Sequence, residues 1–183
     1  MNIPNRLTLF RILIIPLIVV LYYVKPDRHE YDIFNSIIGG LFMIGAATDF
    51  LDGYLARRDN RITTFGKFLD PIADKMLVIT ALLLLVDSGV VQVWIVIVIL
   101  SRDFLVNGVR LLAAGEGQVL AAGTLGKLKT TITMIAIILL LFYGLDEMLL
   151  LGGRVLIYTG VFLTIISGVE YLYKNKAVIL QSK

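Results

Sequence analysis

Six long apolar segments, separated by short polar breaks, dominate the pattern of the chain. Each is close to the roughly 20 residues that a helix needs to cross the hydrocarbon core of a bilayer. Runs such as the four consecutive leucines from Leu82 lack the alternation of a membrane-spanning strand. The pattern therefore predicts an all-α integral membrane protein with six transmembrane helices, at Leu7–Val24, Ile33–Leu55, Phe68–Val86, Val91–Ala114, Leu125–Leu145 and Leu149–Tyr173.

The first segment differs from the others because it begins with polar residues, namely Asn2, Asn5, Arg6, Thr8 and Arg11. No small-residue cleavage site accompanies it, so we expect an amphipathic start that continues into a retained span, not a signal peptide. Glycines inside the later segments are interpreted as positions where helices pack closely. They are Gly39, Gly40, Gly45, Gly152, Gly153 and Gly160.

Composition narrows the classes of protein further. Of 183 residues, 58% are hydrophobic and 17% are charged, whereas soluble domains are typically about half apolar and a quarter charged. The chain has no cysteine, and its single histidine, His29, lies in a polar break, so any metal is expected to be bound by oxygen atoms. We expect one membrane domain over 1–183 without a separate soluble domain.

The basic residues predict the orientation in the membrane. The net charge of +3 is too small for a nucleic-acid-binding protein, but ten basic residues fall at the two termini, in the second and fourth loops and on the flanks of these loops. They are Arg6, Arg57, Arg58, Arg61, Lys67, Lys127, Lys129, Lys174, Lys176 and Lys183. By the positive-inside rule we expect a multi-pass protein of the plasma membrane with both termini in the cytoplasm.

Ionisable residues inside the apolar segments are costly in hydrocarbon and point to function. They are Asp49, Asp52, Asp70, Asp74, Lys75, Arg102, Asp103, Arg110 and Glu170. The alternative is that they neutralise one another in structural pairs. For Asp103 and Glu170 both interpretations remain open, and for Arg102 the alternative role is an ion pair with a helix carboxylate.

The four aspartates stand out by their spacing. Asp49 and Asp52 are three residues apart, and Asp70 and Asp74 are four apart, so each pair shares one face of a helix. Antiparallel packing of the two helices would bring both pairs to a similar depth near the cytoplasmic surface. Four converging carboxylates repel one another unless cations neutralise them. Oxygen ligands of this number suit one or two Mg²⁺ or Mn²⁺ ions.

Small and basic residues follow Asp52. Gly53 and Ala56 leave the helix surface almost free of side chains, so that a ring or a phosphate can approach the backbone. Arg57 adds a cation that can pair with phosphate. From Asp49 to Asp74 the chain reads D-F-L-D-G-Y-L-A-R, then eight residues, then G-K-F-L-D-P-I-A-D.

This stretch resembles the signature of the CDP-alcohol phosphatidyltransferases, D-x2-D-G-x2-A-R-x8-G-x3-D-x3-D, at every fixed position. The resemblance extends over the whole chain and implies metal-assisted transfer of a phosphatidyl group from a CDP-lipid to an alcohol, with release of CMP, by a homodimer. It implies that Asp49, Asp52, Asp70 and Asp74 bind two metal ions, and that Asp74 is also the general base. The residues that it implies for the CDP-lipid are Asp52, Gly53, Ala56, Arg57 and Gly66.

The acceptor alcohol is determined outside the signature. Three segments, at 1–11, 101–111 and 125–130, are similar to those of the bacterial phosphatidylglycerophosphate synthases, which implies CDP-diacylglycerol and glycerol 3-phosphate as substrates. Arg110 and Lys127, with Arg102 and Lys129, are candidates for binding the acceptor phosphate. Alternatively, Lys127 and Lys129 face anionic lipid headgroups.

Other functions remain open at this point. Within the family, the acceptor alternatives are phosphatidylglycerol, serine and an inositol phosphate. A polyprenyl transferase also combines membrane aspartates with Mg²⁺, but aspartate-rich clusters in loops are expected there. A cation transporter is the alternative from a different class, although its carboxylates are expected near the midplane at broken helices in related repeats.

Overall fold

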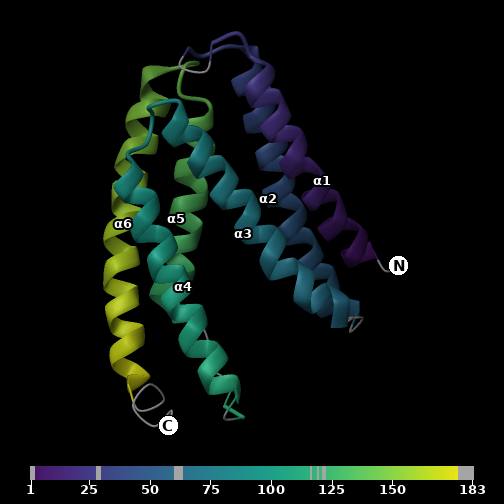
Figure 1. Ribbon diagram of the computed structural model, residues 1–183, viewed down its shortest axis with the longest axis vertical. Helices are drawn as coiled ribbons and strands as arrows, with labels where there is room; N and C mark the ends of the chain where they lie inside the picture. Colours follow the sequence, from purple (N-terminus) through teal and green to yellow (C-terminus); the bar gives the residue numbers. More distant parts are fainter. Residues whose placement is uncertain are drawn as a thin grey trace. The chain divides into compact units, whose positions relative to one another are not determined.

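The computed structural model describes residues 3–27, 30–59, 64–115, 117–118, 120 and 123–176, and within these it leaves out the side chains of 3–6, 49–59, 64–68 and 70. This part of the chain is helical and contains no strand. Its helices, shown in Figure 1, are α1 (Ile3–Val24), α2 (Ile33–Asp59), α3 (Thr64–Asp87), α4 (Val93–Gly115), α5 (Thr124–Leu141) and α6 (Glu147–Lys174). The predicted all-α fold class is confirmed.

Three helices are long and apolar enough to cross a membrane among the residues described. They are α1 from Leu7 to Val24, α5 and α6. Helices α2, α3 and α4 contain the listed ionisable residues of the apolar segments except Glu170, which lies in α6. Among the described residues of α2, Ile33–Thr48 form a shorter apolar helix. The described helices thus support a membrane protein, while the number of six spans remains a prediction.

The ends of the helices follow from local hydrogen bonding. The Asp32 carboxylate accepts from the backbone N–H groups of Phe34 and Asn35, at 3.0 and 3.3 Å, and the Asn35 side chain accepts from Asp32 N, at 3.2 Å. This reciprocal cap starts α2. At the end of α3, Gly89 adopts a φ of 73°, a left-handed conformation that favours glycine.

Helix α5 ends four residues before the predicted boundary at Leu145. From Phe142 onward the backbone bonds shorten to the i to i+3 type, as in Phe142 N to Leu139 O at 3.2 Å. A side chain at Gly144 would meet the ring of Tyr31. Tyr143 also contacts the ring of Tyr31, in the loop between α1 and α2. The turn is apolar although it is not helical, so hydropathy alone could not show where the helix stops.

The described residues divide into two compact units. One unit contains residues from Met1–Val91 and Ile138–Leu150, and the other contains residues from Gln92–Ile137 and Leu151–Lys183. In the first unit, α1 packs against both α2 and α3, and α2 contacts α3. Phe42 and Leu82 are fully buried there, whereas Leu13 on the outer side of α1 is 69% exposed, as suits a helix facing lipid.

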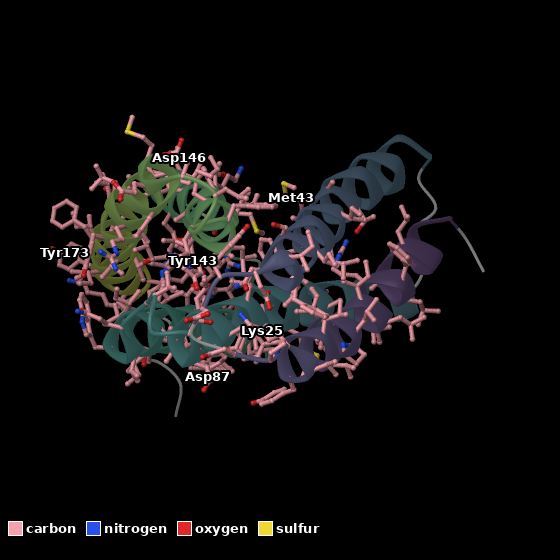
Figure 2. All side chains as sticks on the ribbon, turned by 90° about the horizontal axis from the view of Figure 1, so that it is seen from above. Lys25, Met43, Asp87, Tyr143, Asp146 and Tyr173 are labelled. Atoms are coloured by element: carbon pink, nitrogen blue, oxygen red, sulfur yellow. The ribbon has the colours of Figure 1, made fainter. Side chains whose placement is uncertain are left out.

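The loops of the first unit form a polar cluster around Lys25, whose side chain is fully buried. The Lys25 ammonium donates to Asn35 Oδ1 at 2.7 Å and to Glu30 O at 2.8 Å. Figure 2 labels Lys25 together with Asp87 and Tyr143 of the same unit. Burial, followed by the charges of Tyr31, Asp32 and Asp27, raises the pKa of Tyr143 above its usual value of 10.0, so this hydroxyl stays neutral at physiological pH.

Close packing at glycines is confirmed at three predicted positions and wrong at one. An added Cβ would lie 2.7 Å from Phe142 at Gly39, 2.8 Å from Leu77 at Gly45 and 2.9 Å from Thr133 at Gly160. At Gly40 it would meet no described atom within 4 Å. Gly40 follows Gly39 by about 100° around the helix, so it faces away from the Phe142 contact.

Candidate active site

The signature residues lie on two consecutive helices of the first unit. Asp49 and Asp52 belong to the second half of α2, and Asp70 and Asp74 belong to the first half of α3. Only positions 60–63 separate the two helices, and α2 and α3 lie side by side in Figure 1. A connection this short places consecutive helices antiparallel. This is the orientation in which the two pairs of aspartates can lie at a similar depth.

One contact fixes the register of α2 against α3. A Cβ added at Gly45 would lie 2.8 Å from Leu77 Cδ2. Asp49 follows Gly45 by four residues and Asp74 precedes Leu77 by three, which is about 6 and 4.5 Å along the two axes. Both steps lead toward the connection between the helices. Asp49 and Asp74 therefore belong to turns at a similar height.

Asp74 is the signature carboxylate whose side chain the structure describes. It is half-buried, between the fully buried Ala73 and the buried Leu77 on the same helix. Side chains of the other predicted metal and CDP-lipid residues lie outside the described part, although their backbone is helical. These residues are Asp49, Asp52, Asp70, Gly53, Ala56, Arg57 and Gly66.

Arg11 is a residue near the site that the sequence pattern did not single out. It belongs to the polar start of the first segment, but it is fully buried in α1. Its Nε donates to Gly45 O at 3.2 Å, and Thr48 Oγ1 donates to the same oxygen at 2.7 Å. Gly45 thus joins α1 to α2 one turn before Asp49. The cue in the sequence was an arginine followed by a long apolar run.

The second unit contains a compact cluster of charges around Asp103. Asp103 Oδ1 accepts from Lys129 Nζ at 2.6 Å and from Arg102 Nη1 at 3.1 Å. Lys129 is only 3% exposed. Arg102 Nη2 also donates to Ser167 Oγ, at 3.1 Å. The alternative interpretation of Arg102, an ion pair with a helix carboxylate, is therefore confirmed.

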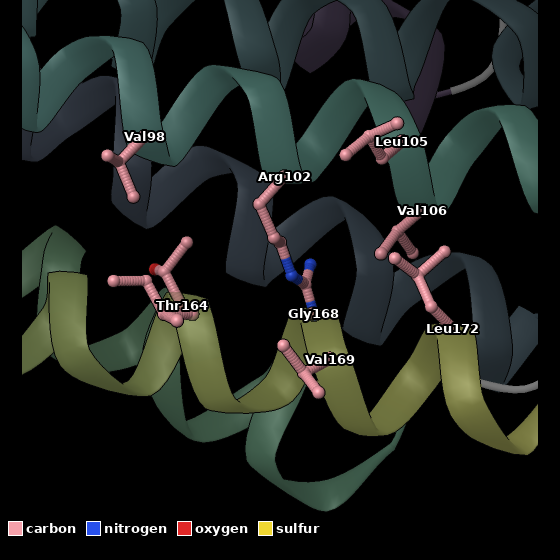
Figure 3. Close-up of a pocket in the computed structure, with 9 residues that line it drawn as sticks. Val98, Arg102, Leu105, Val106, Thr164, Gly168, Val169 and Leu172 are labelled. Carbon is pink, nitrogen blue, oxygen red and sulfur yellow. The ribbon is translucent and has the colours of Figure 1, made fainter.

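Small residues make room for Arg102. Its side chain extends from α4 toward Gly168 of α6, beside an apolar pocket lined in part by Val98 and Val169 (Figure 3). A Cβ would lie 3.0 Å from Arg102 Cγ at Gly168 and 3.2 Å from Nη2 at Gly126. Larger residues at these glycines would displace the guanidinium from its partners.

The other two acceptor-site candidates are placed differently. Arg110 is half-buried, donates from Nε to the Tyr171 hydroxyl at 3.3 Å and lies over the Tyr171 ring, 5.6 Å from its centre. Lys127 is exposed on the first turn of α5. Both cations are thus more accessible than Lys129. Glu170, for which a structural pair was the alternative, forms an ion pair with Lys174 one turn later.

The donor chemistry and the register of α2 and α3 fit a divalent metal site. The signature provides four carboxylates, the hard oxygen ligands that Mg²⁺ and Mn²⁺ prefer, on two helices held at a matched height. Among the described side chains, no group of three or more histidines, cysteines, aspartates or glutamates could hold a metal. The aspartates of the signature remain the candidate ligands.

Comparisons with known proteins agree with the signature. The model of the CDP-alcohol phosphatidyltransferase family matches residues 1–166. A Bacillus subtilis protein is 42% identical over 95% of both chains, and one from Haemophilus influenzae is 36% identical over 99% of this chain and 97% of its own. Both are named CDP-diacylglycerol-glycerol-3-phosphate 3-phosphatidyltransferase.

A Pseudomonas fluorescens protein of the same name is 39% identical over 94% of this chain and 89% of its own. The match to the family model and the matches to these relatives each span most of the sequence, including the four signature aspartates. Enzymes of this family generally depend on divalent metal ions. The chain belongs to the CDP-alcohol phosphatidyltransferase family.

Proposed function

We propose that the protein transfers the phosphatidyl group of CDP-diacylglycerol to glycerol 3-phosphate, giving phosphatidylglycerol phosphate and CMP. The observation that carries this proposal is the complete signature on α2 and α3, with Gly45 and Leu77 in contact one turn from its first and last aspartates. The names of relatives that are 36 to 42% identical to this chain support glycerol 3-phosphate as the acceptor.

The reaction requires one base and no covalent enzyme intermediate. The Asp74 carboxylate takes the proton from a hydroxyl of the acceptor, and the hydroxyl oxygen bonds to the lipid-side phosphorus. The bond from that phosphorus to the bridging oxygen breaks, and its electrons leave with CMP. A half-buried aspartate at a helix position of fixed height is suited to this role, because it is shielded from bulk water and still accessible to a substrate.

Asp49, Asp52, Asp70 and Asp74 would hold the metal ions, for which we propose two Mg²⁺ or Mn²⁺. When bound, such ions neutralise the diphosphate, stabilise the departing CMP and lower the pKa of a nearby hydroxyl. All four of these positions are aspartates, which carry negative charge. The metal requirement is therefore built into the signature.

For the nucleotide, we propose that Gly53, Ala56 and Gly66 let the CDP group approach the helix backbone. Arg57 pairs with its phosphates, and Asp52 contributes as a ligand shared between the metal ions and the CDP-lipid. Absence of a large side chain at three positions allows the flat cytosine ring and the diphosphate to lie against helical backbone. The planar guanidinium of Arg57 matches the geometry of a phosphate group.

For the acceptor, we propose that Arg110 and Lys127 bind the phosphate of glycerol 3-phosphate. Arg110 is oriented by Tyr171, and Lys127 is exposed on the first turn of α5. Arg102 and Lys129 take a lesser part, because Asp103 already accepts a hydrogen bond from each. Their two positive charges still exceed the single negative charge of Asp103, so the cluster attracts an anion nearby.

The decisive experiment is an acceptor panel. Purified protein is supplied with CDP-diacylglycerol and Mg²⁺, and CMP release is measured with glycerol 3-phosphate, serine, phosphatidylglycerol and inositol phosphate. We expect CMP release with glycerol 3-phosphate alone. Release with another acceptor only would keep the chemistry and reassign the substrate. Failure to release CMP with any of them would contradict the proposal and return the cation transporter as the main alternative.

We further propose that the protein is a homodimer in the plasma membrane with its active site and both termini on the cytoplasmic side. Because the chain has no cysteine, a single Asn60→Cys variant allows a clean test of the loop between α2 and α3. An impermeant thiol reagent should label this cysteine only after cells are made permeable. Labelling from outside intact cells would overturn the orientation.

A further inference from the structure

Arg11 is a buried cation inside the apolar helix α1. The residue is fully buried, and it lies within the span Leu7–Val24. A guanidinium stays charged at all physiological pH values, and a charge in the middle of a membrane helix costs several kcal/mol on most scales. Protein groups are therefore expected to bind the Arg11 guanidinium.

The contacts of Arg11 lead to the backbone of the signature. Its Nε donates to Gly45 O at 3.2 Å, and Thr48 Oγ1 donates to the same oxygen at 2.7 Å. In an α-helix this carbonyl also accepts the backbone N–H four residues later, which here is that of Asp49. The first aspartate of the signature is thus bonded, through its own backbone, to the carbonyl that Arg11 and Thr48 bind.

The same glycine sets the position of the third helix. Leu77 of α3 reaches the backbone at Gly45, where a Cβ would lie only 2.8 Å away. Leu77 is 1% exposed and follows Asp74 by three residues. Three helices therefore meet at Gly45, about one turn from Asp49 and about one turn from Asp74.

We infer that Arg11 is a positioning residue: by binding Gly45 O it ties α1 to α2 beneath the aspartates and holds the two signature helices at the height at which their carboxylates bind metal together. This inference rests on the proposed function, since it concerns the same four carboxylates. Metal sites are sensitive to such supporting contacts, whose loss typically weakens metal affinity about 10-fold to 100-fold.

The chain offers a matched control in Lys25, near the other end of α1. Its side chain is also fully buried and also donates to a backbone carbonyl, that of Glu30, at 2.8 Å. Arg11→Met and Lys25→Met each remove one buried cation and one bond to a carbonyl of the first unit. Lys25→Met also removes a hydrogen bond to Asn35 Oδ1. The comparison is informative because the carbonyl bound by Arg11 precedes a signature aspartate by one turn and the carbonyl bound by Lys25 does not.

The test measures Mn²⁺ binding by the electron paramagnetic resonance signal of free Mn²⁺, with thermal unfolding alongside. We expect Arg11→Met to raise the Kd for Mn²⁺ about 10-fold or more, Arg11→Lys to restore part of the affinity, and Lys25→Met to leave it unchanged. Thr48→Val, which removes the second donor to Gly45 O and keeps the shape of the residue, should shift the Kd in the same direction by less.

A wild-type Kd in Arg11→Met, or an equal rise in Lys25→Met, would overturn the inference and leave Arg11 a structural residue. If Arg11→Met does not fold, Arg11→Lys and Thr48→Val carry the same comparison. The result is separate from that of the proposed function. That function fails if the wild-type protein releases no CMP with glycerol 3-phosphate, whatever the Kd for Mn²⁺.

Discussion

The signature on α2 and α3 and the cluster around Asp103 both place ionisable residues in apolar helices, but their charges differ in sign. The signature has four aspartates on two adjacent helices. The cluster has one aspartate that accepts from two cations, Lys129 and Arg102, with Ser167 as a further partner. The cluster neutralises part of its charge within the chain, whereas four carboxylates that share one site favour the binding of divalent cations.

This difference separates a catalytic role from a structural one. An ion pair whose members bind each other within the protein mainly determines which helices pack together. Removal of one member leaves the other buried without a partner and lowers the stability of the protein. Several carboxylates in one apolar site repel one another until cations bind, so their presence points to a cationic ligand. The two regions should therefore respond differently to the same kinds of change.

Removal of divalent cations should have the largest effect. After exhaustive chelation we expect complete loss of CMP release, because the carboxylates of α2 and α3 and the substrate diphosphate cannot share a site without cations. Addition of Mg²⁺ or Mn²⁺ should restore the activity. Full turnover in the chelated protein would contradict the assignment of the signature as a metal site.

The next largest effect is expected from Asp74→Asn. The substitution removes the proposed base and keeps most of the metal ligands, so kcat should fall about 100-fold to 10,000-fold with little change in binding of CDP-diacylglycerol. Asp87→Asn, at the other end of the same helix, is the control. Asp87 accepts from the Tyr22 hydroxyl at 2.9 Å and lies outside the signature. Near-normal kcat in Asp74→Asn would assign the base to another residue.

A smaller effect, confined to one substrate, is expected for the acceptor cations. Loss of a charge-assisted contact to phosphate costs about 1.5 to 3 kcal/mol, or roughly 10-fold to 100-fold in affinity. Arg110→Ala and Lys127→Ala should raise the KM for glycerol 3-phosphate by this factor and leave the KM for CDP-diacylglycerol nearly unchanged. Lys129→Ala should shift it less, because Lys129 is engaged by Asp103.

Unchanged acceptor KM values in both Arg110→Ala and Lys127→Ala would contradict the proposed phosphate site. The same conclusion would follow if glycerol without its phosphate served equally well as the acceptor.

The smallest effect on turnover, and a clear effect on stability, is expected from Asp103→Asn. The change leaves Lys129, which is 3% exposed, without its carboxylate partner. Because Asp103 itself is 30% exposed, we expect a loss of about 2 kcal/mol, below the full cost of breaking a buried pair. This corresponds to a fall in Tm of roughly 4 to 8 °C.

In the double variant Asp103→Leu, Lys129→Met, part of that stability should return, since the buried lysine is removed together with its carboxylate, while Arg102 loses Asp103 and keeps Ser167 as a partner. If Asp103→Asn lowers CMP release at a temperature at which the variant is still folded, the cluster serves catalysis directly.

Much of the fold was predictable because helices in lipid follow directly from long apolar segments. The predicted segments and the observed helices agree within a few residues at most boundaries. The spacing of Asp49, Asp52, Asp70 and Asp74 also predicted two consecutive helices with paired carboxylates. These features depend on local sequence, which hydropathy and helical periodicity describe well.

The remaining features depend on contacts between residues far apart in the chain. Arg11 meets Gly45 across 34 positions, and Lys129 meets Asp103 across 26. Lys25 lies in the polar break after the first apolar segment, yet its side chain is fully buried. A pattern along the chain shows where a charge lies on its own helix, but the partner that neutralises it is set by how the helices pack.

The most direct test of the difference between the two regions is a Mn²⁺ titration of variants from each. Wild-type protein, Asp49→Asn, Asp70→Asn and Asp103→Asn are titrated with Mn²⁺, and free Mn²⁺ is measured by its electron paramagnetic resonance signal without substrate. We expect Asp49→Asn and Asp70→Asn to bind Mn²⁺ at least about 10-fold more weakly than the wild-type protein, and Asp103→Asn to bind it as the wild-type protein does. Equal Mn²⁺ binding in all four proteins, or weakened binding in Asp103→Asn alone, would contradict this expectation.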